Sequence, residues 1–136
     1  RGTTGPGTTD AQVSRTLQRL VDLRGEAWEG RDPAALTLAM APDSPALAAE
    51  QGQLEAARAL GLVYPDVTFR VEEAAVVEQT QGRLTVEATI TRAPLRAIDD
   101  DGDEQLTSGM QTDQLRIVLA AAKEGWLLWS WGEPGR

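Results

Sequence analysis

The 136-residue sequence contains no cysteine, no histidine and no asparagine. Without cysteine, the chain has no disulfide bond, no thiolate metal site and no thiol nucleophile. Without histidine, it lacks the side chain that most often acts as a general base or a metal ligand, so Ser-His-Asp and Cys-His sites within the chain are excluded. The absence of asparagine removes every N-glycosylation sequence.

Basic charge is scarce as well. The chain has 13 Lys+Arg against 21 Asp+Glu, which gives a net charge of −8. Nucleic-acid binding relies on a basic face, so we expect no nucleic-acid partner. No apolar run is long enough for a membrane-spanning helix, so we expect no direct membrane span. A chain of this length suits one domain, whose core is large enough to fold without a disulfide or a structural metal.

The two ends of the chain differ in composition from its middle. Residues 1–9 read RGTTGPGTT, from which we expect a flexible lead, and we expect residues 133–136 to form a loose tail. The domain is therefore expected over residues 10–132. A lead of this kind often follows a signal peptide, lipobox or membrane anchor, so we expect a secreted or membrane-anchored protein located outside the cytoplasm. The 12 Arg against one Lys, with abundant Ala and Gly, are typical of GC-rich genomes such as those of actinobacteria.

The first half of the chain has a helical period. Thr9 or Asp10 is placed to cap a helix that runs to about Glu29. Two further helices are expected over residues 33–40 and 45–60, because each begins with a capping residue followed by proline. The apolar stripe of the first helix recurs at three- and four-residue steps and consists of Val13, Leu17, Leu20, Val21, Ala27 and Trp28.

From residue 67 onward the period changes to two, which indicates strands. We expect one strand around residues 67–72, a second over 84–91, a third within 108–122 and a fourth over 126–131. The connections are short, so the strands should pair antiparallel. The predicted fold class is α+β, with three N-terminal helices packed in a cone against a curved, four-stranded antiparallel sheet.

Five short segments give the chain a resemblance to a known family. They are residues 23–28 (LRGEAW), 30–36 (GRDPAAL), 41–46 (APDSPA), 60–62 (LGL) and 125–128 (GWLL). Over about residues 12–132 the chain resembles the nuclear-transport-factor-2-like (NTF2-like, cystatin-like) superfamily, and in particular small exported actinobacterial domains. The resemblance implies a cone whose open end is often a ligand pocket. Enzymes of the superfamily use an Asp–His pair or an Asp with Tyr; this chain has no His and one Tyr, so no catalytic residue is carried over.

Arg24 falls on the apolar stripe of the first helix, between Leu17 and Trp28 at about 100° per residue. A buried charge is very costly unless it is paired. We therefore expect a structural ion pair with Glu50 on the third helix, with Asp66 and Glu73 as alternative partners. The alternative function of Arg24 is to grip an anionic ligand at the mouth of the cone.

The interior of the cone and the last strand supply the remaining candidate residues. The side chains expected to line the cone are Arg24, Trp28, Met40, Phe69, Glu73 and Trp126. On the last strand, simple alternation places Trp126 and Leu128 on one face. The opposite face would carry Leu127, Trp129 and Trp131, which we expect to form an interface for a homodimer through the sheet. A pocket wall, or a face covered by a chain terminus, is the alternative.

Residues 98–104 read IDDDGDE and have the composition of a calcium loop. With Gly102 as the turn glycine, however, Ala97 and Ser108 occupy the positions at which an EF-hand needs Asp and Glu. We therefore expect a solvated acidic hairpin tip and no metal site; weak divalent-ion binding is the alternative.

Two functions remain open. The first is a non-catalytic domain that binds a small apolar ligand or another protein. The second is a small, cofactor-independent isomerase, dehydratase or cyclase that uses a carboxylate in the cone, for which Glu73 is the candidate. The alternative for Glu73 is a bulge at residues 72–73 or exposure near the rim of the cone. The absence of His and Cys favours the first, and we expect no cofactor in either case.

Overall fold

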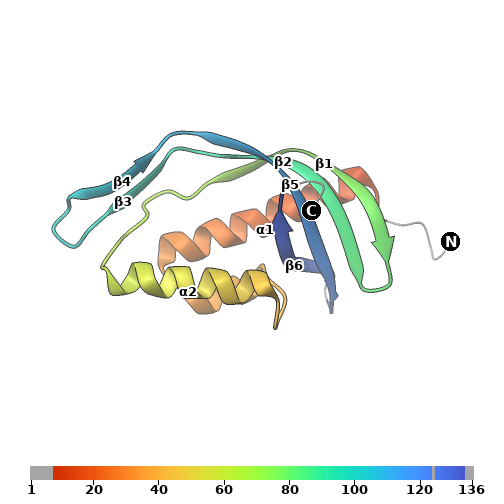
Figure 1. Cartoon of the computed structure of the whole chain (residues 1–136), viewed down its shortest axis with the longest axis horizontal. Coiled ribbons are helices and arrows are strands. Elements are labelled where there is room, and N and C mark those ends of the chain that lie inside the picture. Colours follow the sequence, from red (N-terminus) through yellow and green to blue (C-terminus); the bar gives the residue numbers. More distant parts are fainter. Residues whose placement is uncertain (1–7, 124, 134–136) are drawn as a thin grey trace.

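The computed structural model describes residues 8–123 and 125–133. Most of the expected flexible lead and loose tail, residues 1–7 and 134–136, lies outside the described residues. The elements are α1 (Asp10–Gly30), the 3₁₀ helix η1 (Pro33–Leu38), α2 (Pro45–Ala59), β1 (Phe69–Thr80), β2 (Arg83–Arg92), β3 (Leu95–Ile98), β4 (Glu104–Ser108), β5 (Gln111–Ala122) and β6 (Gly125–Gly132). Both α-helices lie on the concave side of a curved sheet (Figure 1), which confirms the α+β prediction. Among the described residues, no helix combines the length and hydropathy needed to cross a membrane.

The helices begin where the capping residues predict. Thr9 and Gln12 form a capping box, in which the Gln12 amide N–H donates to Thr9 Oγ1 over 3.1 Å and the Thr9 N–H donates to Gln12 Oε1 over 2.8 Å. Ser44 caps α2 by accepting the N–H of Leu47 over 3.1 Å. The short second helix, expected over residues 33–40, is a 3₁₀ helix of six residues, a form that proteins use in short pieces.

The main sheet is antiparallel throughout, with strand order β1-β2-β5-β6. The acidic hairpin expected at residues 98–104 is the end of a second, two-stranded sheet, β3-β4. This second sheet was not predicted, and it continues the β2 and β5 pair beyond a bend. The bend falls at residues 93–94. The N–H of Ala93 still bonds to the carbonyl of Thr68, one step beyond the last pair of β1 and β2, whereas Pro94 has no N–H to donate. The resulting long ribbon curves over the helices in Figure 1.

Side chains of α1 cover the free edge of β1. The Gln18 side chain donates to the carbonyl of Phe69 over 2.9 Å and accepts the N–H of Val71 over 2.8 Å. Asp10 accepts the N–H of Val76 over 2.9 Å near the other end of the strand. These bonds satisfy backbone groups that an edge strand would otherwise leave unpaired. The same bonds hold α1 at a fixed position against the sheet, and so determine the distance between α1 and the sheet.

The core occupies one end of this space. It joins the N-terminal half of α1 to the concave residues of the strands and to the segment before α2; its fully buried members include Val13, Leu17, Leu20, Leu36, Met40, Leu54, Leu84, Ile117, Leu119 and Leu128. At the C-terminal half of α1 the packing changes. There Gly25 lets the chain approach closely, because a Cβ at this position would lie 2.1 Å from the carbonyl oxygen of Val67.

Candidate functional site

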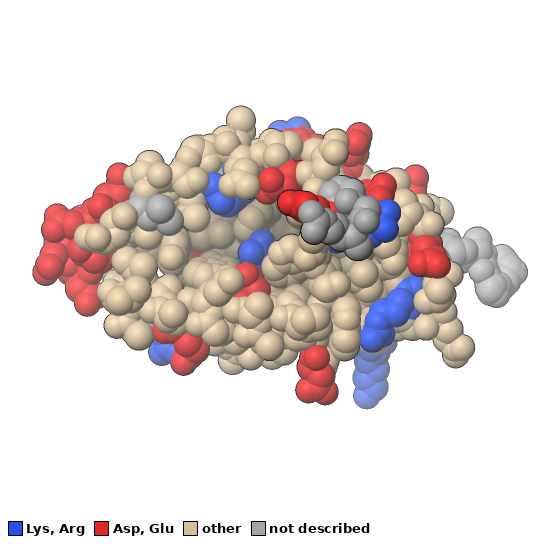
Figure 2. All heavy atoms as spheres, in the orientation of Figure 1, with Lys and Arg blue, Asp and Glu red and all other residues tan. Residues whose placement is uncertain are grey.

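A cavity of about 320 Å³ lies at the end of the cone opposite the core. Figure 2 shows the hollow at the centre of this face, with basic and acidic atoms inside it. Its walls come from the C-terminal half of α1, from α2, from the segment before β1 and from the concave face of the sheet. The volume falls at the lower end of the range typical of small-molecule sites. The mainly apolar walls with a few charged groups are also typical of such sites.

Arg24 and Glu50 form an ion pair in the wall of the cavity. Arg24 Nε lies 2.6 Å from Glu50 Oε1 and Nη2 lies 3.1 Å from Oε2, and Trp28 Nε1 donates to Oε1 over 2.9 Å. Glu50 is 3% exposed. Its carboxylate therefore accepts hydrogen bonds at both oxygens from side chains of α1. Neither alternative partner of Arg24, Asp66 or Glu73, takes part.

The guanidinium of Arg24 also lies over two aromatic rings. Its central carbon is 4.8 Å from the centroid of Phe69 and 4.9 Å from the centroid of Trp131. Both distances suit cation–π contacts. Trp28 in turn meets Tyr64 edge-on, with ring centroids 5.3 Å apart. The charged and aromatic groups of this wall thus hold one another in place.

The expected cone-lining residues divide into two groups. Arg24, Trp28 and Phe69 line the cavity. Met40 is instead fully buried in the core, and Trp126 packs against the core without lining the cavity. Glu73 is exposed on the outer face, because a bulge in β1 between Val71 and Glu73 reverses the alternation of side chains. The carboxylate proposed for catalysis in the cone is therefore outside it.

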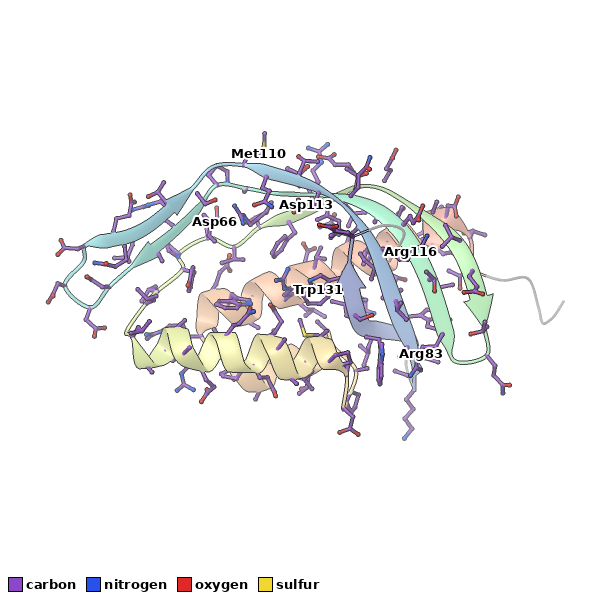
Figure 3. All side chains as sticks on the ribbon, viewed as in Figure 1. Asp66, Arg83, Met110, Asp113, Arg116 and Trp131 are labelled. Carbon is purple, nitrogen blue, oxygen red and sulfur yellow. The ribbon has the colours of Figure 1, made fainter. Side chains whose placement is uncertain are left out.

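A second bulge, in β6, places Trp131 on the face opposite to the one predicted. Leu128 pairs with Leu119 and Ser130 pairs with Val118, so Trp129 is the extra residue. Beyond it, Trp131 pairs with Ile117 and faces the cavity, as Figure 3 shows. Trp129 lies on the outer side, where the Arg83 guanidinium carbon is 4.2 Å from its ring.

Leu127 pairs with Ala120 one residue from the concave Leu128, so it lies on the outer side with Trp129. The expected interface of Leu127, Trp129 and Trp131 therefore does not form one surface, because the bulge sends Trp131 into the cone.

Arg92 and Asp113 line the cavity and were missed by the sequence analysis. Arg92 Nη2 donates to Ser108 Oγ over 2.8 Å and to the carbonyl of Gly109 over 3.1 Å. Its Nε is buried and has no hydrogen-bond partner among the described residues. Asp113 accepts from the side-chain amide of Gln111 over 3.0 and 3.2 Å. A signal for Arg92 was present, since it continues the inward alternation of β2 by one step.

The acidic segment forms the tip of the β3-β4 hairpin, where Figure 2 shows a concentration of acidic atoms. One oxygen each of Asp99, Asp101 and Asp103 lies within 4.8 Å of the others. The Asp99 carboxylate already accepts the N–H of Asp103 over 2.9 Å, the Gln105 amide over 2.6 Å and the N–H of Asp101 over 3.0 Å. These bonds, led by that of Asp103, hold the pKa of Asp99 below its usual range. They are the internal bonds of a hairpin turn.

Several solved structures share this fold. An NTF2-like superfamily protein from Salmonella enterica matches with a TM-score of 0.54 and 14% identity, over 93% of this chain and 94% of that one. The chain has the NTF2-like fold. The intermembrane space region of the chloroplast protein ARC6 shares this arrangement with a TM-score of 0.72 and 17% identity, over 93% of this chain and 97% of that one. Aln2 from a Streptomyces species matches with a TM-score of 0.50 and 15% identity, over 89% of this chain and 85% of that one. No family model and no curated protein matches the sequence.

Proposed function

We propose that the chain is a non-catalytic binding domain that holds a small, largely apolar ligand in its cavity. The observation that carries the proposal is the cavity itself, which has a volume of about 320 Å³ and leaves apolar residues such as Ile90, Leu115 and Phe69 facing an open space. At about 30 Å³ per non-hydrogen atom, the space suits a ligand of about ten such atoms.

Binding is favoured over catalysis by the state of the carboxylates. An isomerase, dehydratase or cyclase of the kind considered needs a carboxylate that is free to take a proton from a bound substrate. Glu73 lies on the outer face. Glu50 lines the cavity, but both of its oxygens accept hydrogen bonds from Arg24 and one also accepts from Trp28. Asp113, the other carboxylate of the lining, is exposed to solvent and accepts the side-chain amide of Gln111. We infer that Glu50 has a structural role.

A homodimer through the sheet and a location outside the cytoplasm remain predictions. The dimer surface is now reduced to Leu127 and Trp129 on the outer face of β6, and Arg83 covers part of the Trp129 ring. A Trp129→Ser variant that leaves the mass measured by light scattering unchanged would contradict a dimer built on this surface.

The four tryptophans provide a direct test of ligand binding. Trp28 and Trp131 line the cavity, whereas Trp126 and Trp129 do not. Titration with 1-octanol, a neutral probe of about ten non-hydrogen atoms, should shift the indole N–H signals of the two lining tryptophans in a saturable way in NMR spectra. The other two signals serve as internal controls, and equal shifts at all four would contradict binding in the cavity.

A matched pair of variants strengthens the test. Leu115→Phe adds volume inside the cavity and should weaken octanol binding. Leu38→Phe makes the same change at a side chain that is 59% exposed, and should leave binding unchanged. Equal effects of the two variants would argue against the cavity as the binding site.

A further inference from the structure

The charges that line the cavity are unequally paired. Glu50 is matched by Arg24, with which it makes two hydrogen bonds. Arg92 has no such partner: among residues 8–123 and 125–133, no carboxylate lies within 4.0 Å of its guanidinium. Its Nη2 donates only to the neutral oxygens of Ser108 and Gly109, and its Nε donates to no described atom. Arg92 is thus the cationic group of the cavity that still lacks an anion.

The aromatic rings of the cavity do not offer an alternative site for a cation. The guanidinium of Arg24 already lies over the rings of Phe69 and Trp131, with its carbon 4.8 and 4.9 Å from their centroids. A cationic ligand that used these rings would have to displace Arg24 from them and separate it from Glu50. Both losses oppose binding of a cation.

Two negative features act against an anion, and neither outweighs the contact with Arg92. Asp113 lines the same cavity, but it is exposed to solvent and accepts from Gln111. The net charge of −8 repels an anion through a long-range field. Salt screens that field beyond about 8 Å at physiological ionic strength, whereas a bound carboxylate would touch Arg92 directly.

We infer that the cavity binds an organic monocarboxylate of about ten non-hydrogen atoms, a size set by about 30 Å³ for each. The carboxylate pairs with the guanidinium of Arg92, and the apolar part of the ligand packs against Ile90, Leu115 and Phe69. The inference rests on the proposed function and adds the chemical class of the ligand. Charge-assisted hydrogen bonds of this kind are the stronger ones in proteins.

A head-group series on the unaltered chain tests this. Octanoate, 1-octanol and octylammonium share one apolar chain and differ in charge, and the indole N–H signals of Trp28 and Trp131 report on binding. Octanoate should bind about tenfold more tightly than octanol, the effect of one charge-assisted hydrogen bond, and octylammonium more weakly than both. Added NaCl should weaken octanoate binding and leave octanol binding unchanged.

The outcomes separate the two proposals. Saturable binding of octanol and octanoate with equal affinity would overturn the monocarboxylate inference and leave the binding domain intact. No response of Trp28 and Trp131 to any probe would overturn the proposed function itself. Tighter binding of octylammonium than of octanoate would also overturn the inference.

Variants of Arg92 and Arg83 test which positive charge binds the carboxylate. Arg92→Met removes the guanidinium and should reduce the affinity for octanoate to that for octanol, while Arg92→Lys should keep part of the preference. Arg83→Met removes one positive charge on the outer side, over Trp129, and should leave the preference unchanged. A folded Arg92→Met variant that still prefers octanoate would overturn the inference. If Arg92→Met does not fold, the head-group series on the unaltered chain decides.

Discussion

Arg24 and Glu50 join α1 to α2 across the wall of the cavity, with Nε 2.6 Å from Oε1 and Nη2 3.1 Å from Oε2. The side chain of Glu50 is 4% exposed and that of Arg24 is 23% exposed, so water screens the pair only in part. Trp28 donates a third hydrogen bond to the same carboxylate. The pair is therefore a structural connection between the helices as well as part of the ligand site.

Removal of one partner should be costly, because it leaves the other charge buried and unpaired. We expect Arg24→Met or Glu50→Met alone to lower the free energy of unfolding by about 3–5 kcal/mol, measured by urea denaturation. The double variant should lower the free energy of unfolding by less than the sum of the losses in the two single variants. As a control, Arg58→Met breaks an exposed pair with Glu55 and should cost less than about 1 kcal/mol. A loss below about 0.5 kcal/mol for Arg24→Met would mean that the pair is not buried in solution.

Several local features could be predicted from the sequence because neighbouring residues determine them. The sequence offers two candidate caps before each α-helix, residues 9 and 10 for α1 and residues 43 and 44 for α2, and these locate the starts of both helices. The apolar period of α1 places Arg24 among buried residues, and the cost of an unpaired buried charge then requires a partner such as Glu50. These predictions needed only helix geometry and electrostatics.

The site as a whole could not be predicted, because two bulges reverse the alternation on which strand predictions depend. The bulge in β1 moves Glu73 out of the cone, and that in β6 moves Trp131 into it. A bulge is one extra residue whose position depends on the partner strand. The sequence therefore offers the bulge at residues 72–73 only as one alternative, and it does not indicate the bulge at Trp129. Volume between elements, and therefore the cavity, depends in the same way on contacts distant in sequence.

The Asp99 carboxyl should titrate below the usual range of aspartate. Its charged form accepts hydrogen bonds from the N–H groups of Asp103 and Asp101 and from Gln105, which lower its pKa. Because the folded pKa is depressed, its contribution to stability is present above the ordinary aspartate value and is lost as the pH falls through the lowered pKa. A carboxyl-detected NMR titration checks this, with the Asp103 amide signal expected to follow the same midpoint. A midpoint at or above the ordinary value would show that the hairpin turn does not form as described.

Gly25 and Gly52 both lie in α-helices, yet the same substitution should have opposite effects on them. At Gly25 an alanine Cβ would lie 2.1 Å from the carbonyl oxygen of Val67, so α1 or the segment before β1 must move. We expect Gly25→Ala to lower the free energy of unfolding by about 1–3 kcal/mol, as overpacking does. A Cβ at Gly52 would have no atom outside its own helix turn within 4 Å. Gly52→Ala should therefore raise the free energy of unfolding by about 0.5–1 kcal/mol, because alanine has the higher helix propensity. Since Val67 lines the cavity, Gly25→Ala should also weaken octanol binding. Urea denaturation that finds both variants stabilised would show that α1 and Val67 are further apart than described.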